Sequence, residues 1–379
     1  MRGATSLLVL VCSGCSLLVS GGNGEADAAP PSELCPSNWS RAMQLTFDAR
    51  FEDLTSLEGD VENVPVAVVL DEDMKADLFL GDGLEDLRFA DSDGNRLPYE
   101  IESAGAPGQP AFVWVRVPRI AGGTVTDYIL AFGGNEDPGP TDEYAPDVWE
   151  GVYSAVWHLS DDPAALAYAD STGHGNQGVA NPAANYLPAD GQIAGAVSAD
   201  NEVNTDAQIE VPSSLDVDLR ASLTVEGWVY LTRKVSNRVH VIQMDNPADS
   251  ETGFDLRSQG TDDNHPEMKI SIENIDTDAE SSRELALNEW HHLAGVFDMD
   301  AGQVRIYVDG RPAGSASIPA PQMGQPLDAG SGVTFADRLV GRLDEIRIAT
   351  FAHAASWIAI QHKSMALDLI NPSPAEDCR

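Results

Sequence analysis

Basic residues are scarce in this chain. Of its 379 residues, 22 are Lys or Arg and 61 are Asp or Glu, which gives a formal net charge of -39 at pH 7. Nucleic-acid phosphates and anionic lipid headgroups are bound mainly through Lys and Arg, so this charge argues against both classes of partner. The carboxylates are those of a solvated acidic surface, which keeps a protein soluble or holds cations.

A long hydrophobic run is also missing from the N-terminus, where the apolar stretch is too short and too interrupted for a stable membrane span. Residues 1–22, MRGATSLLVLVCSGCSLLVSGG, have one early Arg and an apolar stretch broken by small residues. This pattern is typical of a secretion signal. Within it, Ser13-Gly14-Cys15 resembles the bacterial lipobox, although Cys12 stands where that motif usually has Leu or a similar residue.

The lipobox resemblance implies that Cys15 is lipidated and becomes the first residue of the mature chain. The alternative is ordinary signal cleavage between Gly21 and Ala29. The lipobox resemblance also implies that Ser16, which follows the cysteine in place of Asp, directs the lipoprotein to the outer membrane of a two-membrane bacterium. We therefore expect an exported protein. It is either an outer-membrane or cell-surface lipoprotein, which meets the membrane only through its N-terminal lipid anchor, or a secreted or periplasmic protein.

Cysteines are few, and only Cys35 and Cys378 lie beyond the signal. In an oxidising compartment they have only each other as intramolecular partners, so we predict a disulfide between them. Closing so long a loop contributes on the order of 5 kcal/mol to stability in the chain-entropy model.

Helical periodicity is nearly absent; the exception is residues 353–365 (HAASWIAIQHKSM), which predict one or two turns packed over a sheet. Elsewhere the chain has short segments in which apolar and polar residues alternate, separated by clusters of Gly, Pro, Asp and Asn. This pattern is typical of β-sandwiches. We expect an all-β protein with two sandwich domains of the jelly-roll type, at residues 33–137 and 148–370. Residues 1–32 form a signal and flexible tether, and the Pro- and acid-rich residues between the domains form a linker.

Seven short segments of the second region occur in a recognisable order: AVWHLSDD, DSTGHGNQG, GQIAGAV, SLTVEGWVY, EWHHLAGVFD, GQVRIYVDG and GRLDEIRIA. Together they resemble the LamG-like, concanavalin A-like jelly-roll family, from Val156 to about Ala366. In the first region, DLRFADSDGNRLPYEIE, FVWVRVP and YILAFGG resemble the bacterial domain of unknown function numbered 2341. That domain has no established activity, so the resemblance implies architecture more than function.

The pair His291-His292 invites a metal or acid–base interpretation. Neighbouring side chains of a strand point to opposite faces, so the two histidines project apart and do not share one ion. A turn after Phe297 reverses the chain into a second strand, and Asp309-Gly310 supplies the turn that ends this second strand. We therefore expect a structural β-hairpin here.

Catalytic motifs are missing as well. Glucanases of the same broad fold place two carboxylates about 5.5 Å apart, usually on alternate residues of one strand. Asp344 and Glu345 are adjacent, so a regular strand puts them on opposite faces. The sequence also has no nucleophile-elbow GxSxG, HExxH helix or CxxC pair. We expect no catalytic residues and no enzyme activity; a glycoside hydrolase is the enzymatic alternative.

A calcium site is the cofactor that the sequence suggests. Asp170 and Asn176 lie in a Gly-rich turn whose oxygens suit a hard cation. The LamG-like resemblance implies that Asp170, Asn176 and Asp344 lie near a bound calcium. The alternative is that Asp170 and Asn176 only cap an Asx turn without a metal.

The resemblance to LamG modules implies a secreted or surface-anchored binding or adhesion protein, whose partner is a glycan or a surface or extracellular protein. A structural envelope or spacer protein without a ligand is also compatible with the sequence, and so is a glycan-degrading enzyme. The sequence does not choose between the binding protein and the spacer, and the missing catalytic motifs disfavour the enzyme.

The calcium prediction is tested by melting the EDTA-treated protein with and without added calcium. A bound ion raises the melting temperature, because a ligand that binds only the folded state stabilises it. An unchanged melting temperature would leave the metal-free Asx turn as the correct interpretation.

Overall fold

A computed structural model describes residues 34–52, 57–181, 185–201, 207–211, 222–234, 236–246, 251–258, 263–328 and 332–378. The predicted signal and Cys15 lie outside these residues. The predicted all-β class is confirmed, because nearly all regular structure is antiparallel strand arranged in four sheets. Among the described residues, no helix has both the length and the apolar character needed to cross a bilayer.

The first sandwich consists of two sheets. The outer sheet has the order β24-β1-β7-β3-β4, with β25 also paired to β1. Its strands are β1 (Arg41–Phe47), β3 (Arg88–Ala90), β4 (Arg96–Leu97), β7 (Tyr128–Gly133), β24 (Ile370–Pro372) and β25 (Glu376–Asp377). The inner sheet has the order β2-β6-β5, with strands β2 (Val61–Leu70), β5 (Tyr99–Ser103) and β6 (Ala111–Ile120).

The second sandwich also has two sheets. One, which we call the seam sheet, has the order β11-β12-β23-β14-β19-β20-β21, with β8 paired to β23. Its strands are β8 (Ala155–Trp157), β11 (Leu187–Asp190), β12 (Gly195–Asp200), β14 (Leu223–Leu231), β19 (Trp290–Asp298), β20 (Gln303–Val308), β21 (Arg311–Ser317) and β23 (Val340–Ala349).

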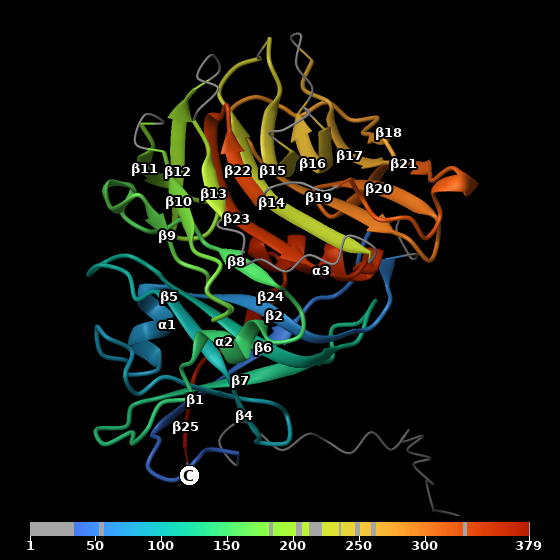
Figure 1. The fold of residues 1–379 in the computed structure, drawn as a ribbon. Helices are drawn as coiled ribbons and strands as arrows, with labels where there is room; N and C mark the ends of the chain where they lie inside the picture. The colour runs from blue at the N-terminus through green and yellow to red at the C-terminus, as the bar shows by residue number, and fades with distance from the viewer. Residues whose placement is uncertain are drawn as a thin grey trace, which may run out of the picture.

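The far sheet has the order β18-β17-β16-β15-β22-β13-β10-β9. Its strands are β9 (Ala167–Tyr168), β10 (Gly178–Ala180), β13 (Ile209–Val211), β15 (Val239–Asn246), β16 (Glu251–Ser258), β17 (Pro266–Ile272), β18 (Ile275–Glu280) and β22 (Gly332–Asp337). Figure 1 shows the two sandwiches stacked, with the C-terminal helix between them.

The helical elements are short: α1 (Glu72–Asp77), α2 (Ala145–Trp149), α3 (Ala355–Met365) and the 3-10 turns η3 (Pro163–Ala165) and η5 (Ala320–Gln322). The predicted helix near the C-terminus is confirmed as α3, which at 11 residues is longer than expected. Most of its residues are buried, because it lies between the sandwiches rather than on an outer face. Gln361 donates to the Pro65 carbonyl of β2 at 2.8 Å, and Ser364 accepts from the Ala67 amide at 2.8 Å.

The predicted hairpin is confirmed by the pairing of β19 with β20. Asp309 and Gly310 have φ angles of 51° and 70° and turn the chain into β21, as expected. The side chains of the two histidines also separate as predicted. His291 lies 3.1 Å from Asp309, whereas His292 lies 3.3 Å from Glu226.

The two ends of the described chain meet on the first sandwich. After α3 the chain leaves the second sandwich, and β24 and β25 pair with β1. The predicted disulfide between Cys35 and Cys378 is confirmed, and it closes a sequence separation of 343 residues. The Cys378 amide also donates to the Ser40 carbonyl at 2.9 Å. The first sandwich is therefore completed by residues from both ends of the sequence.

The sandwiches share one buried apolar cluster. It contains Val66 and Trp114 of the first sandwich together with Trp228, Val296 and Trp357 of the second sandwich and α3. We call this region between the inner sheet and the seam sheet the seam. Because the inner sheet is covered on both faces, separating the sandwiches would expose large apolar side chains to water.

Removing the disulfide tests how strongly the chain ends hold the first sandwich. We expect the double variant C35A/C378A to lose on the order of 2–5 kcal/mol of unfolding free energy, because the cross-link restricts the unfolded chain. Denaturant unfolding of the oxidised parent and the variant measures the loss. A variant as stable as the parent would show that β24 and β25 are held by their strand pairing alone.

Candidate functional site at the seam

A β-bulge in β23 shapes the site. Leu343 and Ile346 both point into the core of the second sandwich, although three positions separate them. Glu345 has a φ of 53°, and the pairing of β14 with β23 shifts in register at this point. The extra residue places Asp344 and Glu345 on the same side of the sheet, facing the seam. The expectation that these two carboxylates point to opposite faces is therefore wrong.

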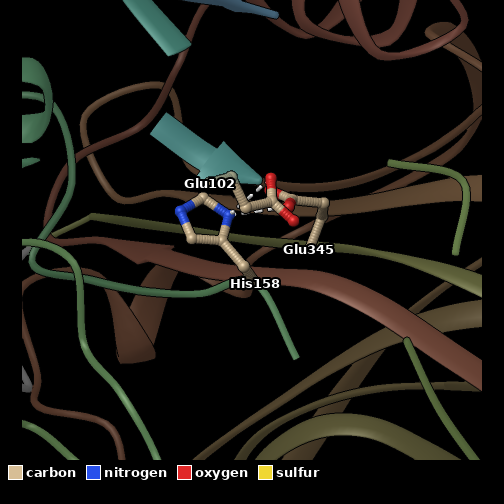
Figure 2. Close-up of side chains that lie close together, drawn as sticks. All are labelled: Glu102, His158 and Glu345. Carbon is tan, nitrogen blue, oxygen red and sulfur yellow. Dashed lines mark hydrogen bonds and ion pairs between the residues drawn. The ribbon is translucent and has the colours of Figure 1, made fainter. Parts of the chain in front are cut away.

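The bulge brings Glu345 to His158, which follows β8. His158 Nδ1 lies 2.7 Å from Glu345 Oε1 and 3.5 Å from Glu102 Oε2, and its Nε2 lies 3.4 Å from Glu100 Oε2. Figure 2 shows the imidazole facing the Glu102 and Glu345 carboxylates. The side chains of His158, Glu102 and Glu345 are 8%, 1% and 0% exposed. This is a closed cluster built from both sandwiches.

Arg347 is the second cation of the cluster and is fully buried. It forms an ion pair with Glu345 and donates to Gln361 Oε1 of α3 at 2.7 Å. The guanidinium carbon lies 4.4 Å from the ring centroid of Trp114 and 4.9 Å from that of Trp149. Cation–π contacts of this kind gain strength when the cation is desolvated.

The two tryptophans also orient the glutamates of β5. The Trp114 indole donates to Glu102 Oε2 at 2.8 Å, and the Trp149 indole donates to Glu100 Oε2 at 2.6 Å. Ser171 donates to the other oxygen of Glu100 at 2.8 Å. Strand alternation explains why these groups meet, because Glu100 and Glu102 are two residues apart and share the seam face of β5.

Burial and the neighbouring charges shift the pKa values of His158 and Glu345 in opposite directions. Burial alone would lower the pKa of His158, but Glu345, Glu102 and Glu100 raise it well above its ordinary value. Burial acts to raise the pKa of Glu345, but His158 and Arg347 outweigh burial and hold this pKa below its usual range. Burial raises the pKa of Glu102 to about 8. At neutral pH the cluster therefore contains imidazolium, a Glu345 carboxylate and a protonated Glu102.

A second buried group lies along the seam at β14. Tyr153 donates to Glu226, and the Trp357 indole donates to the Tyr153 hydroxyl at 3.2 Å. Burial acts to raise the pKa of Glu226, but His292 and Arg347 lower it to about 2. The imidazole of His353 stacks on Trp357 with 4.3 Å between ring centroids. These contacts join β14 and α3 to the segment between α2 and β8.

The structure places the predicted calcium residues in two settings. Asp170 accepts hydrogen bonds from the amides of Thr172 and Asn176, both at 3.0 Å. The contact with Thr172, two residues on, is that of an Asx turn. Asp344 instead faces the seam, where its Oδ2 accepts from the amides of Gln192 and Ile193 at 2.8 and 3.0 Å. The calcium site stays a prediction.

Two cavities open along the seam. One, which we call the outer cleft, has a volume of about 530 Å³ and is lined by residues of both sandwiches, among them Glu102, Gln109, Ser160 and Asp190. The other, which we call the helix groove, has a volume of about 410 Å³ and lies beside α3. Its lining residues are Arg50, Phe51, Glu52, Leu57, Asp309, Gly310, Arg311, Ala359, His362, Lys363 and Asp368.

Both family resemblances are confirmed by family models. Residues 203–359 match the concanavalin A-like lectin/glucanases superfamily, and residues 83–144 match the domain of unknown function 2341. No curated protein matches the chain.

Several solved structures have a similar arrangement of strands over part of the chain. The binding domain of Paraclostridial Mosquitocidal Protein 1 is 14% identical with a TM-score of 0.44, and the match covers 56% of this chain and 52% of that one. Domain 4 of an extracellular arabinanase from Geobacillus stearothermophilus, solved with arabinotriose, is 21% identical with a TM-score of 0.42, covering 55% and 96%. The botulinum neurotoxin serotype G binding domain is 12% identical with a TM-score of 0.42, covering 55% and 50%. The chain thus spans about half of the mosquitocidal and neurotoxin chains, and we draw no functional argument from likenesses this distant.

The pKa of Glu102 generates a prediction about stability. Because its folded-state pKa of about 8 lies above the ordinary 4.5, the folded chain holds a proton that the unfolded chain releases in this interval. This stabilisation is complete below about pH 4.5 and is lost as pH rises through about 8. In EDTA, we expect the unfolding free energy to fall between pH 5 and 8.5.

The variant E102Q should reduce this fall by on the order of 2 kcal/mol, because Gln has no proton to lose. E289Q changes an exposed glutamate and serves as the control. Urea unfolding at several pH values measures the effect. Equal pH dependence in parent and E102Q would show that Glu102 is ionised throughout.

Proposed function

We propose that this chain is an exported binding protein that recognises a glycan through its second sandwich, at the helix groove. The observation that carries the proposal is the mixture of groups on the walls of this groove. Three cations, three carboxylates, an imidazole and the Phe51 ring line about 410 Å³. The description of the matched family, which names lectins and glucanases, supports a carbohydrate ligand.

The groove suits sugar chemistry because a sugar ring has hydroxyls that both donate and accept, and an apolar C–H face. The Arg311 side chain is exposed and makes no hydrogen bond or ion pair with another described residue, so its donors are available. Burial lowers the pKa of His362 to about 4, so its imidazole is neutral and offers one donor and one acceptor. Phe51 provides an aromatic surface for the C–H face.

The charges of the groove also differ from those of the whole chain. Arg50, Arg311 and Lys363 balance Glu52, Asp309 and Asp368, whereas the chain as a whole carries -39. A neutral or acidic glycan therefore meets no net repulsion here. Lys363 is held in place by the carbonyl of Arg50 at 3.1 Å, so α3 and the first sandwich position it together.

A glycan-degrading activity is disfavoured at the seam cluster. Glu345 is fully buried, and both of its oxygens are engaged, by His158 and by Arg347. A carboxylate so enclosed does not reach a glycosidic bond. Adhesion to a surface or extracellular protein, and a spacer role without a ligand, are distinguished from glycan recognition by a binding screen.

The remaining parts of the proposal concern location and cofactor. We propose export, with a lipid anchor at Cys15 as the only membrane attachment. We also propose calcium as the ligand of the Asp170–Asn176 turn. The melting experiment with EDTA and calcium tests this second point independently of glycan binding.

The proposal is tested by a glycan-array screen of the mature chain, run with calcium and with EDTA, followed by titration of any glycan that binds. R311A should weaken binding at least tenfold, because it removes the guanidinium available to the ligand. R238A, which removes an exposed arginine outside the groove, should leave the affinity unchanged.

Three results would contradict parts of the proposal. Equal binding by parent and R311A would reject the helix groove. No binding in either condition would reject glycan recognition and favour protein adhesion or a spacer role. Release of reducing ends from a bound polysaccharide would establish glycan degradation instead.

A further inference from the structure

Glu102, His158 and Glu345 form the one group of three potential metal ligands found among the described residues. One ligand atom from each lies within 4.8 Å of the other two. Glu102 belongs to β5 of the first sandwich, His158 follows β8, and Glu345 sits at the bulge of β23. The three residues are far apart in sequence, so folding alone brings their ligand atoms together.

Each of the three is also held by an outer partner. His158 presents Nδ1 to the group, and its Nε2 lies 3.4 Å from Glu100. Glu345 presents Oε1, and its Oε2 is paired with Arg347. Glu102 is oriented differently, because its Oε2, the oxygen 3.5 Å from His158 Nδ1, itself accepts from the Trp114 indole. Metal-binding histidines and carboxylates are oriented by outer hydrogen bonds of this kind.

Two buried carboxyl oxygens at the site have no hydrogen-bond partner. They are Oε1 of Glu102 and Oδ1 of Asp344, the neighbour of Glu345. Buried polar atoms are almost always paired, so an unpaired oxygen in such a place requires an explanation. A divalent cation bound between Glu102 and Glu345 would give the unpaired Glu102 oxygen a partner and would take the place of the protons on Glu102 and His158.

We propose that Glu102, His158 and Glu345 bind one divalent transition-type cation of the Zn²⁺ class. One imidazole nitrogen and two carboxylate oxygens suit such an ion better than calcium, which prefers oxygen ligands only. Glu102 also lines the outer cleft of about 530 Å³, which gives an ion a route to the site. The bound ion bridges the two sandwiches.

This inference is independent of glycan binding, because Arg311 and the helix groove take no part in it. It also differs from the calcium prediction in its ligands and in its metal. A variant that loses glycan binding can therefore still be tested for metal binding, and a variant that loses metal binding can still be tested for glycan binding.

The experiment uses the full mature chain without a histidine tag, stripped with EDTA and dialysed. Calorimetric titration with Zn²⁺ should show one saturable site per chain. H158Q should abolish this site, and E102Q should weaken it at least tenfold. H240Q is the matched control, because His240 also lies beside two carboxylates, at 3.0 Å from Asp255 and 3.8 Å from Asp337. It should bind Zn²⁺ as the parent does.

A second measurement needs no variant, which matters because H158Q removes a buried cation and can unfold the chain. X-ray absorption of the Zn²⁺-loaded parent should show one imidazole together with carboxylate oxygens. Absence of a saturable site, equal affinity in E102Q, loss of binding in H240Q, or a shell with two or more imidazoles would each overturn the proposal.

Discussion

The assembly of this protein depends on a buried arginine. A guanidinium taken out of water loses several kcal/mol of solvation, and this cost is offset only when partners are in place on every side. Arg347 finds them in Glu345 of its own strand, Gln361 of α3, and the rings of Trp114 and Trp149. These partners belong to both sandwiches, α2 and the C-terminal helix. Arg347 is therefore satisfied only when all of these elements are assembled.

The seam follows from this constraint. The inner sheet of the first sandwich presents Glu100, Glu102 and Trp114 on its outer face, where an isolated sandwich would expose them to water. In the assembled chain that face is covered by α3 and the seam sheet, and the helix itself is bonded to β2. The helix groove and the outer cleft lie at this junction and are lined by both sandwiches. A ligand in either cavity therefore contacts the assembled chain rather than one domain.

The alternating pattern of short strands predicted the all-β class, the hairpin after His292 and the position of the turn at Asp309. The scarcity of cysteine predicted the disulfide, because only one pairing was possible. The cluster of His158, Glu102 and Glu345 could not be predicted from the sequence, for two reasons. The bulge at Glu345 interrupts the alternation by which successive side chains of a strand point to opposite faces of the sheet, and no sequence motif predicts a bulge at this position. His158 and Glu102 meet only because two sandwiches stack, and sequence spacing contains no signal of such stacking.

The central claim, that the seam makes the two sandwiches one cooperative unit, is tested most directly by differential scanning calorimetry of the oxidised chain at pH 7. The account predicts a single transition whose van't Hoff enthalpy equals the calorimetric enthalpy of the whole chain. Two resolved transitions, each with the enthalpy of one sandwich, would show that the sandwiches unfold independently and would contradict it.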